Sequence, residues 1–224
     1  MGEVTGTITS LADVRPGDLM FTNIGGFIPG VFPVKLGQLV LGERVRLGPL
    51  SVDHVGVVVS SIGETSLGSI QRMVQAMPGG AEEVPLTKAR YWTPGVAFAR
   101  LPEDYPGQAQ DAAAIARAFV SEKIPYSFGS YLALAAWRYG IKAERLEKWI
   151  NRRRPDLIAE LPRGRQHEIA LPAEAICSVL ADQAWSLAGK RVMEGVAHQA
   201  VTPGALALRC WKDRQVIWGG AGLA

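Results

Sequence analysis

The alternation of apolar and polar positions is clearest in DHVGVVVS, residues 53–60. An extended chain places successive side chains on opposite faces of a sheet, so residues two apart share a face. One face of this segment receives Val55, Val57 and Val59, and the other receives His54, Gly56 and Val58. The pattern predicts a β-strand, the best defined one in the chain.

Other segments have the pattern of strands in the same sheet. IQRMVQAM, residues 70–77, follows a turn at Gly63-Glu64 and brings Gln75 to the same face as Gln71 and Met73. GVAFARLP, residues 95–102, predicts a third strand. Pro-Gly turns also precede two apolar runs, LMF at 19–21 and ALALRCW at 205–211. We interpret both runs as turn-then-strand elements of one sheet.

Helical spacing of apolar residues dominates the middle of the chain. An Ala-rich segment from about Gln108 to Glu122 has one apolar face, and Pro125 ends it. Helices are also expected over 126–140, over the more polar 142–154, and as a short element at 34–42. In CSVLADQAWSLAG, residues 177–189, apolar residues again recur at helical spacing, which predicts a helix that begins near Cys177.

Length and composition favour one globular domain. The chain has 224 residues, with 48% hydrophobic and 20% charged residues, and we expect a single domain over 1–224. Its start has neither a basic segment nor an apolar core, and no apolar run approaches the ~20 residues of a membrane span. We therefore expect a soluble protein, cytoplasmic as synthesised, that would reach the cell envelope only by another route.

The charge is mildly positive, with a formal net value of +3, and it is unevenly distributed. Much of the basic excess lies in a stretch at about 138–170 that includes Arg152, Arg153 and Arg154. These arginines are candidates for an anionic polymer or lipid surface, although a solvated helix face is the favoured interpretation. No aromatic-interleaved basic pattern supports specific nucleic-acid binding.

Cys177 is the candidate nucleophile. At a helix start, unpaired backbone N–H groups and the positive end of the helix dipole favour a thiolate. The alternative interpretation is a small buried apolar residue, the role of most free cysteines. The second cysteine, Cys210, has no such setting, and the spacing of the two favours free thiols over a disulfide framework.

A nucleophilic thiol needs an imidazole as base and a polar group that orients the imidazole. Among the three histidines, His54 lies on the predicted strand, whereas His167 lies in the basic stretch and His198 in a predicted turn. Gly56, beside His54, is expected to leave room for a group to approach. If 70–77 pairs with 53–60, the Gln75 amide oxygen can accept the imidazole N–H that faces away from sulfur. No histidines and cysteines stand at zinc-ligand spacing, so neither metal nor cofactor is expected.

The order of these motifs resembles a known family. PGDLMF, DHVGVVVS, VQAMPGG with EEVPL, PYSFGSYL, ICSVLADQAW and VTPGALA follow one another over about residues 13–210. This order is similar to that of the circularly permuted NlpC-type papain-like superfamily of cell-wall cysteine peptidases and amidases. Lecithin retinol acyltransferase-like enzymes are relatives. In the permuted branch the histidine strand precedes the cysteine helix, as it does here.

The resemblance implies an α+β, papain-like fold whose mostly antiparallel sheet packs against the cysteine helix. By position it implies Cys177 as nucleophile, His54 as general base and Gln75 as the third polar residue. The family more often has an acidic residue or histidine at the third position, so Gln75 is a departure. The implied activity is cleavage of an amide, such as a bond in a peptidoglycan stem peptide. Two alternatives stay open: acyl transfer or hydrolysis on a lipid, and a binding or assembly module without activity.

Overall fold

The computed structural model describes residues 11–23, 46–47, 50–60, 71–86, 96–126, 176–196, 198, 201–212 and 216–219. The predicted helices at 34–42 and 142–154, nearly all of the one at 126–140, and the basic stretch with its three arginines lie outside these residues. The expectation of a single domain stays a prediction.

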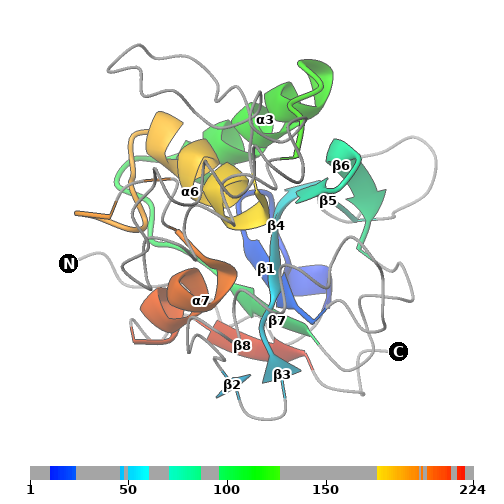
Figure 1. Ribbon diagram of the computed structural model, residues 1–224. Coiled ribbons are helices and arrows are strands. Elements are labelled where there is room, and N and C mark those ends of the chain that lie inside the picture. Colours follow the sequence, from blue (N-terminus) through cyan, green and yellow to red (C-terminus); the bar gives the residue numbers. More distant parts are fainter. Residues whose placement is uncertain are drawn as a thin grey trace.

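Strands and helices are combined in an α+β arrangement, as the resemblance implied (Figure 1). A six-stranded sheet has the order β6-β5-β4-β1-β7-β8, and every neighbouring pair is antiparallel. Its strands are β1 (Leu19–Thr22), β4 (His54–Ser60), β5 (Arg72–Met77), β6 (Gly80–Pro85), β7 (Val96–Ala99) and β8 (Val216–Gly219). The other elements are η1 (Leu11–Asp13), a small hairpin of β2 (Arg46–Leu47) and β3 (Leu50–Ser51), α3 (Gln108–Ser121), α6 (Cys177–Leu187) and α7 (Pro203–Lys212).

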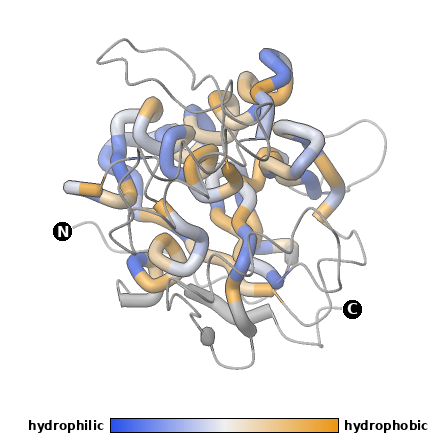
Figure 2. Tube along the Cα trace, in the orientation of Figure 1, coloured by the Kyte–Doolittle hydropathy of each residue, from blue (hydrophilic) through white to orange (hydrophobic). Residues whose placement is uncertain are grey.

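The alternation predicted for β4 is confirmed, because its two faces join different hydrophobic clusters. Val55, Val57 and Val59 belong to the larger cluster, which includes the buried side chains of α3 and α6. Val58 belongs to a second cluster, built from other strand residues such as Met73 and Phe98. The helices therefore pack on one face of the sheet. Figure 2 shows apolar segments along both the strands and the helices.

Helix α6 is held in place by hydrogen bonds near its C-terminal end. The indole N–H of Trp185 donates to the backbone oxygen of Gly17, just before β1, at 3.0 Å. The backbone oxygen of Ala188 accepts from the side chains of Gln108 and Tyr105 at 2.7 and 2.9 Å. These contacts link α6 to both the sheet and α3, so the helix that begins at Cys177 has a defined position against the strands.

One predicted strand is wrong, because residues 203–212 form helix α7. The buried residues Leu206, Ala207 and Cys210 follow helical spacing, which an extended chain would divide between two faces. The hydroxyl of Thr202 accepts the backbone N–H of Ala205 at 3.1 Å, and Pro203 occupies the first helical position. A threonine cap followed by proline is a helix-start signal that outweighs the Pro-Gly turn.

Candidate functional site

The strands β4 and β5 bring His54 and Gln75 together, as the alternation pattern predicted. Val57 pairs with Val74 and Val58 with Met73. In this register the two polar residues lie diagonally opposite on one face, within reach of long side chains. Nε2 of His54 lies 2.7 Å from Oε1 of Gln75, and both side chains are buried. The expected imidazole–amide contact is therefore confirmed.

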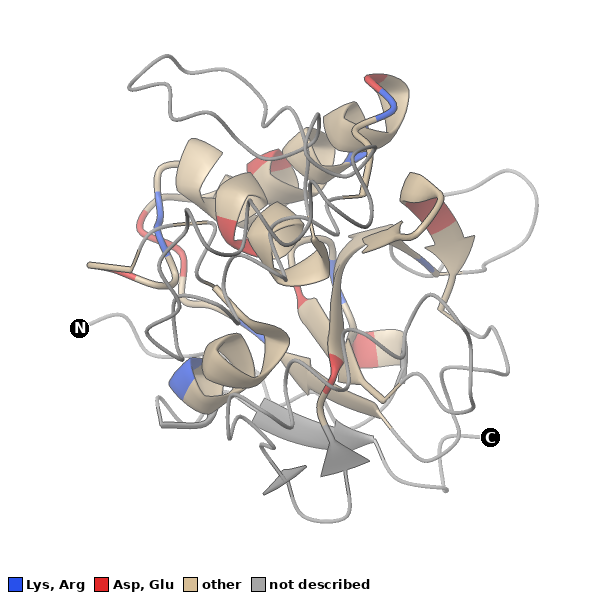
Figure 3. Cartoon of the chain, viewed as in Figure 1, with Lys and Arg blue, Asp and Glu red and all other residues tan. Residues whose placement is uncertain are grey.

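The same amide makes a second hydrogen bond that the sequence analysis did not predict. Nε2 of Gln75 donates to Oε1 of Glu82 at 2.7 Å. Glu82 belongs to β6 and lies directly across from Gln75 in the β5–β6 hairpin. The three side chains form a continuous chain from the edge of the sheet to the imidazole. Figure 3 shows the acidic segment of β6 at that edge.

Cys177 is the first residue of α6, in agreement with the prediction of a helix start. Ile176 precedes it in an extended conformation, and no side chain at this cap position bonds the first turn. The helix dipole and the backbone N–H groups of the first turn therefore act near Cys177, where they favour a thiolate. Cys177 is buried, and α6 contacts both β4 and β5, the strands that carry His54 and Gln75 (Figure 1).

Tyr126 is a neighbour of Cys177 that the sequence analysis left without a role. Burial raises the pKa of Tyr126 well above its ordinary value, and the negative charge of a Cys177 thiolate raises it further. The phenol thus stays protonated at neutral pH. The signal available in the sequence was PYSFGSYL, quoted above for the resemblance, in which Tyr126 follows Pro125.

The room expected beside Gly56 is already filled. A Cβ built on Gly56 would lie 2.9 Å from the sulfur of Met73 and 3.0 Å from the backbone oxygen of Val74. The glycine therefore permits close packing of β5 against β4. The interpretation that it leaves space for an approaching group is wrong.

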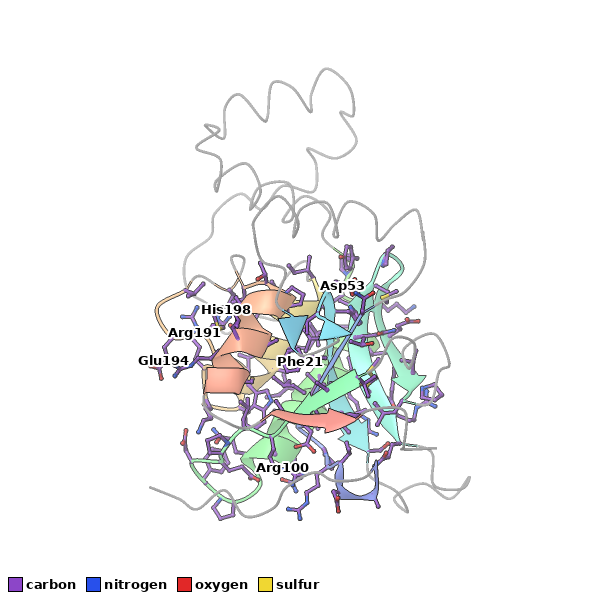
Figure 4. All side chains as sticks on the ribbon, turned by 90° about the horizontal axis from the view of Figure 1, so that it is seen from below. Phe21, Asp53, Arg100, Arg191, Glu194 and His198 are labelled. Carbon is purple, nitrogen blue, oxygen red and sulfur yellow. The ribbon has the colours of Figure 1, made fainter. Side chains whose placement is uncertain are left out.

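His198 has a separate partner. Its Nδ1 lies 2.6 Å from Oδ2 of Asp182, and the backbone N–H of Met193 donates to the other carboxylate oxygen at 3.0 Å. Asp182 is five residues after Cys177, which is about 7.5 Å further along a helix axis. Figure 4 labels His198 beside Arg191 and apart from Asp53, the residue before His54. This histidine joins the segment after α6 to the helix, and His167 lies outside the described residues.

A buried ion pair and a small cavity lie at the other end of the sheet. Asp18, just before β1, binds the Arg100 side chain through both carboxylate oxygens at 2.8 and 2.9 Å. A cavity of about 60 Å³ lies beside the pair, with Trp185 in its wall. His54 pairs with Thr22 at the opposite end of β1, and Figure 4 shows Arg100 and Asp53 well separated. This cavity is thus remote from the imidazole.

Within the described residues, no group of three or more histidine, cysteine, aspartate or glutamate side chains is arranged to hold a metal ion. In the same part of the chain, no helix combines the length and apolarity needed to cross a membrane. Comparison of the sequence with protein-family models finds no match, and comparison with curated proteins finds none either.

Proposed function

We propose that the protein is a thiol-dependent hydrolase that cleaves an amide bond, with Cys177 as nucleophile and His54 as base. The observation that carries this proposal is the buried hydrogen bond between His54 and Gln75, on strands against which the helix beginning at Cys177 packs. Thiol hydrolysis requires a nucleophile, a base and a group that orients the base. These three residues have the chemistry for those roles.

In the proposed reaction, the Cys177 thiol gives its proton to Nδ1 of His54, and the thiolate attacks the carbonyl carbon of the substrate. The backbone N–H of Cys177 and the phenol of Tyr126 donate to the oxygen that becomes negative. His54 then returns the proton to the leaving amine, and water releases the acyl group from sulfur. Cys177 belongs to the cluster on the helix face of the sheet, whereas the alternation of β4 directs His54 to the other face. The proposal therefore requires that the Cys177 sulfur reach Nδ1 at the start of β4, where His54 is the first residue of the strand.

The resemblance extends the proposal to fold and substrate. An antiparallel sheet in which the histidine strand precedes the cysteine helix supports a permuted papain-like fold. On this basis we propose a peptide of the bacterial cell wall as the substrate. Purified wall fragments and short-chain acyl esters, offered in parallel, test this choice. Release of new amino groups from the fragments supports it, whereas turnover of esters alone would favour the lipid-directed alternative.

Alkylation by iodoacetamide tests the nucleophile without knowledge of the substrate. Cys177 and Cys210 are both buried, so burial alone predicts equally slow labelling. The proposal predicts that Cys177 is labelled first at neutral pH, and that His54→Ala slows its labelling by roughly a hundredfold, a typical contribution of a general base. Cys177→Ser identifies the labelled site by mass spectrometry. Equal labelling rates at both cysteines in the folded protein would exclude the nucleophile.

A further inference from the structure

Gln75 has hydrogen bonds of opposite sense at the two ends of its amide. Its NH₂ group donates to Glu82 and its oxygen faces the His54 imidazole, both at 2.7 Å. An amide can rotate by half a turn and exchange these two ends at little steric cost, so Gln75 alone does not determine which end meets the imidazole. The group on its other side must determine it.

An ionised carboxylate can only accept hydrogen bonds, whereas an amide can donate with one end and accept with the other. If the Gln75 amide turned over, its oxygen would face the Glu82 oxygen, and two acceptors would meet where a hydrogen bond now lies. Glu82 therefore keeps the NH₂ group on its own side. The amide oxygen then faces His54 and requires a proton on Nε2.

We propose that Glu82 is a positioning residue that acts through Gln75 to select the Nε2-protonated tautomer of His54, an inference that rests on the proposed function. In the neutral imidazole, a proton on Nε2 leaves Nδ1 unprotonated. Nδ1 is then able to take the thiol proton, while the Nε2–H bond to Gln75 persists in the imidazolium. Glu82 also supplies, two hydrogen bonds away, the negative charge that an amide lacks.

The neighbouring residue on β6 provides a matched control. Glu83 points to the opposite face of the strand, where its carboxylate binds Arg72 at 2.8 Å and Arg117 at 3.3 Å. Glu83→Gln thus makes the same chemical change one residue away, with loss of ion pairs but without a connection to His54. Because Glu82 lies at the sheet edge and is only partly buried, its variants are expected to fold.

The test measures the tautomer of His54 by nitrogen–proton correlation spectra of the imidazole in the full chain, with the resonances assigned by His54→Asn. We expect a proton on Nε2 and none on Nδ1 in the unaltered protein and in Glu83→Gln. In Glu82→Gln, the new amide can present either end, so both tautomers should appear, and Cys177 alkylation should slow by about tenfold. In the combined variant Gln75→Glu with Glu82→Gln, the new carboxylate at position 75 accepts from His54, and the new amide at position 82 donates to that carboxylate. This variant should restore both the Nε2-protonated tautomer and the alkylation rate of Cys177.

The outcomes separate the two proposals. An unchanged His54 tautomer in Glu82→Gln and in Glu82→Ala, with Cys177 still reactive, would overturn the role of Glu82 and leave the hydrolase proposal standing. A tautomer that depends on Glu82, in a protein whose Cys177 is no more reactive than Cys210, would instead support the positioning role and overturn the proposed function. Failure of the combined variant to restore the tautomer would also contradict the positioning role.

Discussion

At the scale of single residues, Gln75 has the most demanding position in the candidate site. Its side chain is completely buried and forms hydrogen bonds to both His54 and Glu82. A buried polar group that loses its partner costs about 1–3 kcal/mol, because the water that would replace the partner is excluded. A change at Gln75 is therefore expected to affect both the folded state and the imidazole. A residue that only stabilises the sheet, or only orients the imidazole, would affect one of the two.

We expect Gln75→Ala to lower the free energy of unfolding by about 1–3 kcal/mol and the rate of Cys177 alkylation by about tenfold, equivalent to ~1.4 kcal/mol. Gln71→Ala is the matched control. Gln71 is also buried, and its amide donates to the backbone oxygen of Val14 at 3.3 Å, remote from His54. Its removal should reduce stability and leave the alkylation rate of folded protein unchanged. Urea unfolding beside alkylation kinetics distinguishes the variants, and parallel behaviour of both would refute an orienting role for Gln75.

At the scale of elements, strands with clean alternation could be predicted from the sequence, and elements defined by their partners could not. The patterns of β4 and β5 located His54 and Gln75 correctly, and helical spacing located the start of α6. Strand β6 was missed because Glu82 and Glu83 interrupt its apolar pattern, although Pro78-Gly79, the two residues between the paired Met77 and Gly80, is a turn signal. The Glu82–Gln75 contact depends on that hairpin, so this part of the site could not be predicted either.

The start of α7 offers a test of why residues 203–212 form a helix. If Thr202 caps the helix through the N–H of Ala205, Thr202→Ala should lower the free energy of unfolding by about 1 kcal/mol, and Thr202→Ser should retain most of it. Thr202→Val preserves shape but removes the cap, so it should resemble Ala. If strand propensity governed this segment, Val would be neutral or stabilising. Urea unfolding of the three variants provides the measurement.

At the scale of the whole molecule, long-range polar contacts connect neighbouring strands of the six-stranded sheet at two places. One is the His54–Gln75–Glu82 chain across three strands, and the other is the ion pair of Asp18 with Arg100, which joins the start of β1 to the end of β7. Sequence patterns indicate which face a residue occupies but not which distant residue it meets. For this reason Gln75 could be proposed as a partner of His54, whereas Asp18 and Arg100 could not be paired in advance.

The ion pair has a predictable pH dependence. Burial raises the pKa of Asp18 above its ordinary value of 3.8 and outweighs the opposing effect of the hydrogen bonds from Arg100 and from the backbone of Arg15. The hydrogen bond to Asp18 raises the pKa of Arg100. A carboxyl with a higher pKa in the folded protein binds a proton more readily when folded. Its contribution to stability is therefore greatest at low pH, and it falls as the pH rises from 3.8 through the raised pKa.

Arg100→Met should accentuate this dependence, because it leaves the Asp18 carboxylate buried without its guanidinium. Loss of one partner of a buried pair costs about 3–5 kcal/mol, and we expect a loss of this order at about pH 7, where the carboxyl is ionised in the unfolded chain. Part of the loss should be recovered at about pH 4, as Asp18 takes up a proton in the folded state. The double variant Asp18→Asn with Arg100→Met has no titrating group at position 18. Its free energy of unfolding should therefore not show the recovery at about pH 4. Urea unfolding at both pH values measures the free energy of unfolding of each variant. If Arg100→Met loses the same free energy at both pH values, the buried charge of Asp18 is not the cause of the loss.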